Sequence, residues 1–149
     1  MLASRELELA ALAKVAGRSQ LSLEELASTP AYHGLTPNPD CVYDGTLIEL
    51  SYRAPLLADG GELVVCILGP FWDRVFQIEF LGVTALELLG FGSSIDMDLR
   101  EIQLDFAAYA PRCKFLGLSF PTSIAITYTS STVTRLSLER PIARSQLGT

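Results

Sequence analysis

The densest acidic stretch in the sequence consists of Asp96, Asp98, Glu101 and Asp105. On a strand, Asp96 and Asp98 point to the same side, about 7 Å apart along the chain. Two carboxylates at that spacing can hold a hard cation such as Ca²⁺ or Mg²⁺, or they can meet basic side chains of a partner. They can equally form a solvated strand face, because Arg100 is near enough to pair with them. We take the four acidic residues as candidate partner contacts and assign no metal.

Trp72 is the fifth candidate for partner contact. It is the only tryptophan in the chain and stands next to Phe71, directly after a Gly-Pro pair. An exposed tryptophan concentrates binding energy at an interface, whereas a lone tryptophan can also pack over the edge of a core. The sequence leaves both interpretations open.

The sequence contains no recognisable catalytic arrangement. His33 is the only histidine, so a Ser-His-Asp or Cys-His site would have to use it. It lies in a proline-rich stretch with no nucleophile at local spacing. The chain has no nucleophile elbow, phosphate-binding glycine loop or dinucleotide fingerprint. We therefore assign no catalytic residue and no cofactor.

Composition restricts the class of partner. Of 149 residues, 49% are hydrophobic and 19% are charged, so the chain can bury a core and is not disordered. The 17 acidic and 11 basic residues give a net charge of -6. Nucleic acid and anionic membranes both favour a basic surface, so we expect neither as a partner. Mean hydropathy is +0.32, which predicts an exposed apolar patch covered by a second copy, in a homo-oligomer, or by another protein.

The cysteines indicate a cellular compartment. Cys41, Cys66 and Cys113 are odd in number and widely spaced. A secreted chain of this size more often has an even disulfide framework, and no pair here has the spacing of a zinc or redox site. We interpret them as reduced thiols in a cytoplasmic protein. The longest apolar stretch, 63–68, is far too short to span a bilayer as a helix.

The first forty residues differ from the rest. Helical spacing predicts a first helix between the N-cap Ser4 and the stop Gly17, with these residues on its apolar face: Leu7, Ala10, Ala11, Lys14 and Val15. Ser22 followed by Glu25 is a capping box and predicts a second short helix that ends at 29–30. Its buried residues would be Leu23 and Leu26. A proline-rich loop follows.

From Cys41 onward the period of the apolar residues changes from 3.6 to 2, which predicts strands. Ile48, Leu50 and Tyr52 are expected on one face of a strand over 46–54, and 63–68 is apolar on both faces. Further strands are expected at 74–81, 83–89, 99–106, 112–118, 124–129 and 132–139. Inward positions include these residues: Phe76, Ile78, Phe80, Ile102, Leu104 and Phe106. Ser130 and Ser131 would form the turn of a last hairpin.

These elements predict an α+β class that is mostly β. We expect a single domain over 1–149, with a helical N-terminal part (1–29), a proline-rich loop (30–40) and an antiparallel β part (41–140). Its architecture is an antiparallel meander sheet or a small sandwich of about 7–8 strands, preceded by two short helices. Repeated βαβ units are excluded, because no helix-length segment separates the strands.

Part of the chain resembles a known group of proteins. The residues that carry the likeness are Tyr43-Asp44-Gly45-Thr46-Leu47, Phe80-Leu81-Gly82-Val83, Leu86-Glu87-Leu88, Gly90-Phe91-Gly92, Ile95 and Asp98. This pattern, over roughly residues 43 to 98, resembles small β-rich bacterial proteins of unknown function, including immunity proteins of polymorphic toxin systems. Tyr43 departs from it, since histidine is usual there. The resemblance implies an intracellular, non-enzymatic binding protein.

The leading hypothesis is therefore a non-catalytic intracellular binding protein, such as an immunity-type protein, that binds a protein partner. The alternative is a small-ligand-binding protein or enzyme with a pocket inside a curved sheet, lined by Tyr52, Phe76, Phe80 and Phe106. A third hypothesis is a structural subunit of a larger assembly.

Overall fold

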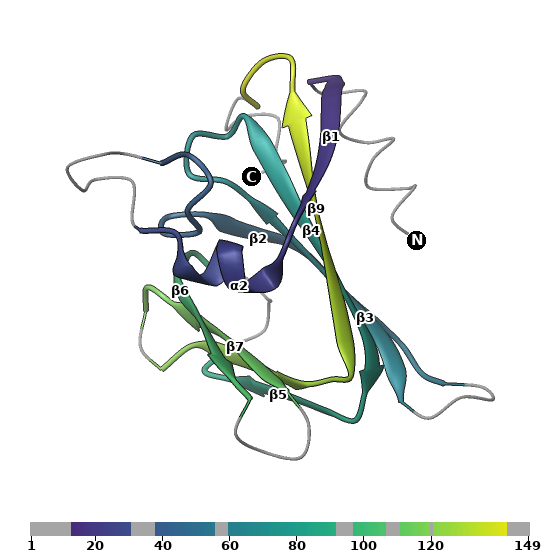
Figure 1. Cartoon of the computed structure of the whole chain (residues 1–149). Coiled ribbons are helices and arrows are strands. Elements are labelled where there is room, and N and C mark those ends of the chain that lie inside the picture. Colours follow the sequence, from purple (N-terminus) through teal and green to yellow (C-terminus); the bar gives the residue numbers. More distant parts are fainter. Residues whose placement is uncertain are drawn as a thin grey trace.

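Two antiparallel sheets make up most of the protein (Figure 1). The computed structural model describes residues 13–30, 38–55, 60–91, 97–106, 111–119 and 121–142. The five-stranded sheet has the order β1 (Val15–Leu21), β9 (Ser130–Leu138), β4 (Arg74–Val83), β3 (Gly61–Leu68) and β2 (Thr46–Arg53). The four-stranded sheet has the order β5 (Ala85–Leu89), β8 (Ser123–Thr127), β7 (Arg112–Gly117) and β6 (Leu99–Asp105). The mostly-β class is thus confirmed.

The described residues contain one helix, α2 (Leu23–Ser28), so the expectation of two N-terminal helices is wrong. Residues 15–17, the expected end of the first helix, lie in β1, which pairs antiparallel with β9. Pairing with a distant strand overrides a local helical period, because the ladder satisfies the same backbone groups. Residues 4–12 of that expected helix lie outside the described residues, whereas Ala13 and Lys14 are described and are not helical.

The second predicted helix and its N-cap at Ser22 are confirmed as α2. The Ser22 side-chain oxygen accepts a hydrogen bond from the Glu25 amide at 3.0 Å, and Leu23 and Leu26 are buried. Thr29 has extended backbone angles and ends the helix. A helix this short is marginal in isolation, so tertiary packing of its apolar side must hold it.

Replacing Ser22 by alanine is expected to lower the free energy of unfolding by about 1 kcal/mol, because the Glu25 amide loses its partner. Urea unfolding followed by circular dichroism measures the change. Ser22→Asp is the control, since a carboxylate caps equally well and also favours the positive end of the helix. Equal stability of the alanine and aspartate variants would contradict a capping role.

The two sheets are joined by a two-stranded ribbon that bends from one into the other. β4 pairs with β9 in the five-stranded sheet, and β5 pairs with β8 in the four-stranded sheet. Between them, the Thr84 amide donates to the Thr127 carbonyl and the Thr129 amide to the Leu81 carbonyl, both at 2.9 Å. Neither ladder is interrupted for long at this corner, so the sheets share a continuous backbone connection.

This corner corrects the expected topology. β8 and β9 follow each other in sequence but lie in different sheets, so they form no hairpin. The residues expected at its turn, Ser130 and Ser131, belong to β9. The sequence predicted either a single meander sheet or a small sandwich. The structure has two sheets and not a single meander sheet.

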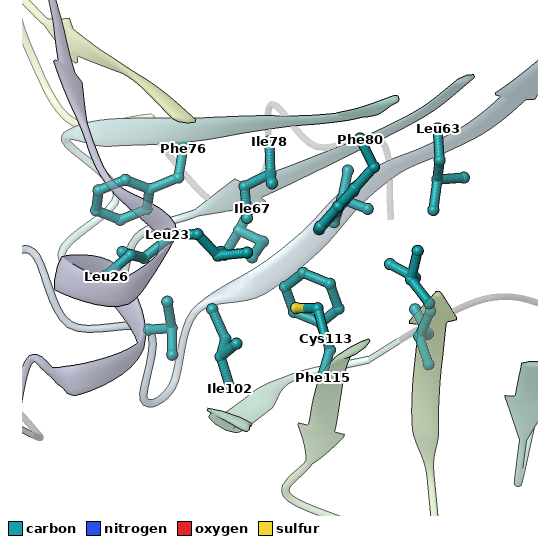
Figure 2. Packing of buried hydrophobic residues seen from close by; sticks show 14 of the residues in the cluster. Leu23, Leu26, Leu63, Ile67, Phe76, Ile78, Phe80, Ile102, Cys113 and Phe115 are labelled. Carbon is teal, nitrogen blue, oxygen red and sulfur yellow. The ribbon is translucent and has the colours of Figure 1, made fainter. Parts of the chain in front are cut away.

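The main core lies between the sheets and contains side chains from both (Figure 2). Leu23 and Leu26 of α2 enter it between Phe76 of one sheet and Ile102 of the other. Phe80 makes edge-on contacts with Phe115 and Tyr128, with ring centroids 6.2 and 4.9 Å apart. The inward positions predicted for β4 are confirmed: Phe76, Ile78 and Phe80 are fully buried.

One predicted face is wrong because a β-bulge shifts the alternation, whereas Ile102 and Leu104 of β6 face the main core as predicted. A bulge between Leu47 and Glu49 places Ile48 against the cluster on the outer face of the sheet, whereas Leu50 packs against the main core. A bulge adds one residue and so reverses the face of every side chain beyond it. At the strand ends, Tyr52 is 48% exposed and Phe106 is 53% exposed.

Candidate functional site

The outer face of the four-stranded sheet carries the charged groups of the site. Because Cys113, Phe115, Ile124 and Ile126 are buried in the main core, the residues that alternate with them point outward. Neighbouring strands then align three rows across the face: Ala85–Thr127–Arg112–Asp105, Glu87–Ala125–Lys114–Gln103 and Leu89–Ser123–Leu116–Glu101.

This face is hollowed along β8, where the outward side chains are small. Ser123 is 5% and Ala125 7% exposed although both face outward, because longer side chains on β5 and β7 stand above them. Three hollows of about 190, 320 and 140 Å³ open here, and Lys114 lines all of them. Lys114 therefore lies at the centre of a shallow trough whose floor is Ser123 and Ala125.

The trough holds two cations on one strand. Arg112 and Lys114 are two residues apart on β7, so they point to the same side at a spacing of about 7 Å. Neither forms an ion pair within the part of the chain that the structure describes. Leu89 on the edge strand β5 is exposed and lines two of the hollows. The arrangement offers two positive charges beside a rim that carries Glu87 and the exposed Leu89.

Two of the predicted acidic residues lie on this same face. Glu101 and Asp105 point outward from the edge strand β6, and Asp105 is paired in register with Arg112. Arg100 Nε lies 3.6 Å from Glu101 Oε1, so Arg100 pairs with one of the acidic residues, as its position in the sequence suggested. The face is thus divided into a basic strip on β7 and an acidic strip on β6.

The other predicted residues lie elsewhere. Asp98 precedes the bulge in β6 and lines a separate hollow of about 330 Å³, where its Oδ1 accepts a hydrogen bond from the Thr46 hydroxyl at 3.0 Å. Trp72 lies in the β3–β4 turn and packs against the outer cluster of the five-stranded sheet. Its backbone carbonyl accepts a hydrogen bond from the Ile142 amide. Asp96 and His33 lie outside the described residues.

A cluster of ionic contacts that local sequence patterns did not reveal holds the segment around Asp40. Asp40 accepts hydrogen bonds from Arg74 Nη1 at 2.6 Å and from Arg135 Nη1 at 2.5 Å. Arg74 also bonds Asp73, and this contact is the main reason that the pKa of Arg74 is raised; burial opposes the shift and Asp40 adds to it. Arg135 Nε donates to the Ser19 hydroxyl at 3.1 Å. The cluster thus ties the segment around Asp40 to β1, β4 and β9.

That segment leads directly into contacts with β6. The Asp44 amide donates to the Leu99 carbonyl at 2.8 Å, and the Leu99 amide to the Gly45 carbonyl at 2.7 Å. A β-carbon on Gly45 would lie 2.8 Å from the Val42 carbonyl oxygen, so the close approach requires glycine. The first residue of β6 is therefore held by backbone bonds to the segment that leads into β2.

The three cysteines are buried and form no disulfide. Burial raises the pKa of the Cys113 thiol. Burial is also the main cause that raises the pKa of Tyr128 to about 12; the charges of Cys113 and Glu24 add to it, while a hydrogen bond with Ser131 opposes it. Since thiolate is the reactive form, Cys113 is an inert core residue.

These shifts predict a loss of stability in alkaline solution. In the unfolded chain a thiol ionises near pH 8.5 and a tyrosine near pH 10, whereas the folded chain keeps both groups neutral. The free energy of unfolding should stay level below about pH 8.5 and fall from there toward pH 12. Urea midpoints measured between pH 7 and 11 test this. Tyr128→Phe should flatten the fall above about pH 10, and an unchanged slope in that variant would contradict the assignment.

The described residues show no metal cluster and no membrane-spanning helix. Among the described residues, no group of three or more His, Cys, Asp or Glu could hold a metal ion. No helix in the described part of the chain is long and apolar enough to cross a membrane. The chain matches no protein-family model, no curated protein and no solved structure.

Proposed function

We propose that the protein is a non-catalytic intracellular binding protein and that the outer face of its four-stranded sheet holds a protein partner. The observation that carries this proposal is the trough around Lys114, in which two cations without a described ion-pair partner stand over a floor of small side chains. Unpaired charges beside exposed apolar area are typical of a surface that a partner completes.

The charges of the face specify the chemistry of the partner. An acidic side chain of the partner fits between Arg112 and Lys114, while basic side chains fit the strip of Glu101 and Asp105. The partner's apolar groups would cover Leu89 at the rim. A toxin domain bound by an immunity-type protein is the narrower form of this proposal, and it rests on the sequence resemblance alone.

The geometry gives less support to the small-ligand alternative. Its four lining residues do not converge on one cavity, since Phe76 and Phe80 are fully buried in the main core while Tyr52 and Phe106 are exposed.

Lys114→Glu is expected to weaken partner binding at least tenfold, about 1.4 kcal/mol, because it places a carboxylate where the partner's acidic group lies. The first probe is a short glutamate-rich peptide titrated into the labelled full chain. Amide shifts in NMR spectra should concentrate on β7 and β8 and disappear with a glutamine-for-glutamate peptide. The partner captured from host lysate by the wild type should then be lost by Lys114→Glu.

Lys14→Glu is the matched control, because Lys14 is the only other lysine and its side chain is 72% exposed on the edge of the other sheet. This variant should keep both the peptide and the captured partner. The proposal fails if both charge reversals act alike, or if the peptide shifts map to residues away from the trough.

A further inference from the structure

The strand β5 differs from the other three strands at the borders of the two sheets. β1, β2 and β6 each contain a register shift in their pairing, whereas all five residues of β5 pair with β8 without one. Bulges and charged side chains at a sheet edge keep other strands from pairing there. β6 also carries the charges of Arg100, Glu101 and Asp105, but β5 carries only Glu87. β5 is therefore the border strand that is least protected against pairing.

The free edge of β5 is accessible. Within the described part of the chain, β8 is the only strand that pairs with it. Four of its five residues are exposed, among them Leu88 at 44% and Leu89 at 57%. In a strand, half of the backbone N–H and C=O groups point to each edge. Those of β5 that point away from β8 can therefore pair with a strand of another molecule.

The side chains of β5 specify which strand fits. Leu86 and Leu88 pair with two isoleucines of β8 that are buried in the main core, so both leucines point to the inner face. Leu86 packs against the core, whereas Leu88 leaves the end of this row uncovered. Glu87 points outward between them. An added strand is complementary if it places apolar side chains beside the two leucines and a basic side chain beside Glu87.

A second copy of this chain fits the edge less well. When two β5 strands pair antiparallel, the register that uses all five residues places Glu87 directly opposite its counterpart. Like charges in directly opposite positions destabilise a pair of strands. The edge therefore favours a different chain, with a basic residue at the central position.

We infer that the protein partner supplies an extended strand that pairs with the free edge of β5 and enlarges the four-stranded sheet. This strand has a basic residue opposite Glu87 and apolar residues opposite Leu86 and Leu88. Backbone hydrogen bonds hold it in place, and the alternating side chains select it. The inference rests on the proposed function, because it names the element by which the same partner binds beside the trough.

The probe is the peptide acetyl-STVKVTS-amide, titrated into the labelled full chain and followed by NMR. Its lysine can lie opposite Glu87 with a valine on each side, and shifts should concentrate on β5. Two N-methylated versions are compared, one methylated at both valines and one at both threonines, because alternate amides of a strand point to opposite edges. The version methylated on the edge that faces β5 should bind about fivefold more weakly or worse, and the other should stay within about twofold of the unmodified peptide.

Exchanging the charges tests the register. Glu87→Lys should weaken binding of acetyl-STVKVTS-amide by about fivefold and strengthen binding of acetyl-STVEVTS-amide, because attraction across the pair becomes repulsion and the reverse. Glu139→Lys is the matched control. It makes the same change of charge at an exposed side chain that follows β9 on the other sheet, and it should alter neither affinity.

Other results would overturn the inference. If both methylated peptides lose binding, or if neither does, the peptide does not pair as a strand. If a second copy occupies the edge, the β5 signals of the wild type change with protein concentration before any peptide is added. The glutamate-rich peptide tests the trough separately. If that peptide binds at β7 and β8 while the strand peptide does not bind at β5, the strand inference alone fails; the reverse result supports the strand and overturns the trough.

Discussion

Gly82→Ala is expected to lower the free energy of unfolding by about 2–4 kcal/mol, because the added methyl group meets both an unfavourable backbone conformation and a lack of space. Gly82 has a φ of 65°, where a side chain is strained. A β-carbon there would lie 2.3 Å from Oγ1 and 2.7 Å from Cβ of Thr129. Gly60 approaches the same backbone, since its own β-carbon would lie 2.6 Å from the Gly82 carbonyl carbon. The corner thus has no room for a larger residue.

Urea unfolding of Gly82→Ala and Gly17→Ala separates the cost of a crowded, strained position from the general effect of replacing a glycine by alanine. Gly17 lies in a strand and has no atom within 4 Å of its β-carbon position, so its substitution should change stability little. Combining Gly82→Ala with Thr129→Gly removes the collision and leaves the backbone strain, so part of the loss should be recovered. A midpoint for Gly82→Ala equal to that of Gly17→Ala would contradict this account of the corner.

Leu26→Ala is expected to cost about 2–5 kcal/mol. Leu26 is fully buried, and with Leu23 it fills the space between the two sheets on the side where α2 lies (Figures 1 and 2). Truncation leaves a cavity that a six-residue helix, already marginal by itself, can fill only by moving. The substitution should therefore change the environment of residues in both sheets.

The measurement combines urea unfolding with amide shifts on Phe76 and Ile102, one from each sheet. Glu24→Ala, on the exposed side of the same helix, is the control and should stay within about 0.5 kcal/mol of the wild type. If Leu26→Ala costs no more than this control, or if shifts stay confined to one sheet, α2 does not fill the space between the sheets.

Local sequence patterns correctly predicted the elements that are determined by residues close together in the chain. The 63–68 segment is apolar on both faces and became β3, which contributes to both clusters. The Ser22–Glu25 pair became a cap because every atom it needs lies within four residues. The faces of β2 were wrong because one inserted residue at a bulge leaves no mark in the composition of a strand.

The candidate site was only partly predictable. Glu101 and Asp105 were identified because they are close in sequence, and they do share a face. Lys114 was missed, since its importance comes from Ser123 and Ala125 on the neighbouring strand, whose small size creates the hollow. The bonds of Asp40 to Arg74 and Arg135 span 34 and 95 residues, and no spacing rule connects partners that far apart.

The ribbon that bends through the corner has a consequence for cooperativity. Leu81 pairs with Ser130 in one sheet and Ala85 with Thr127 in the other, so a few residues on each strand separate the two ladders. A seam of weak contacts would let one layer melt ahead of its neighbour, but here the same two strands continue through both. We therefore expect the two layers to unfold together as one cooperative unit, so that loosening the face that carries Lys114 destabilises the whole molecule.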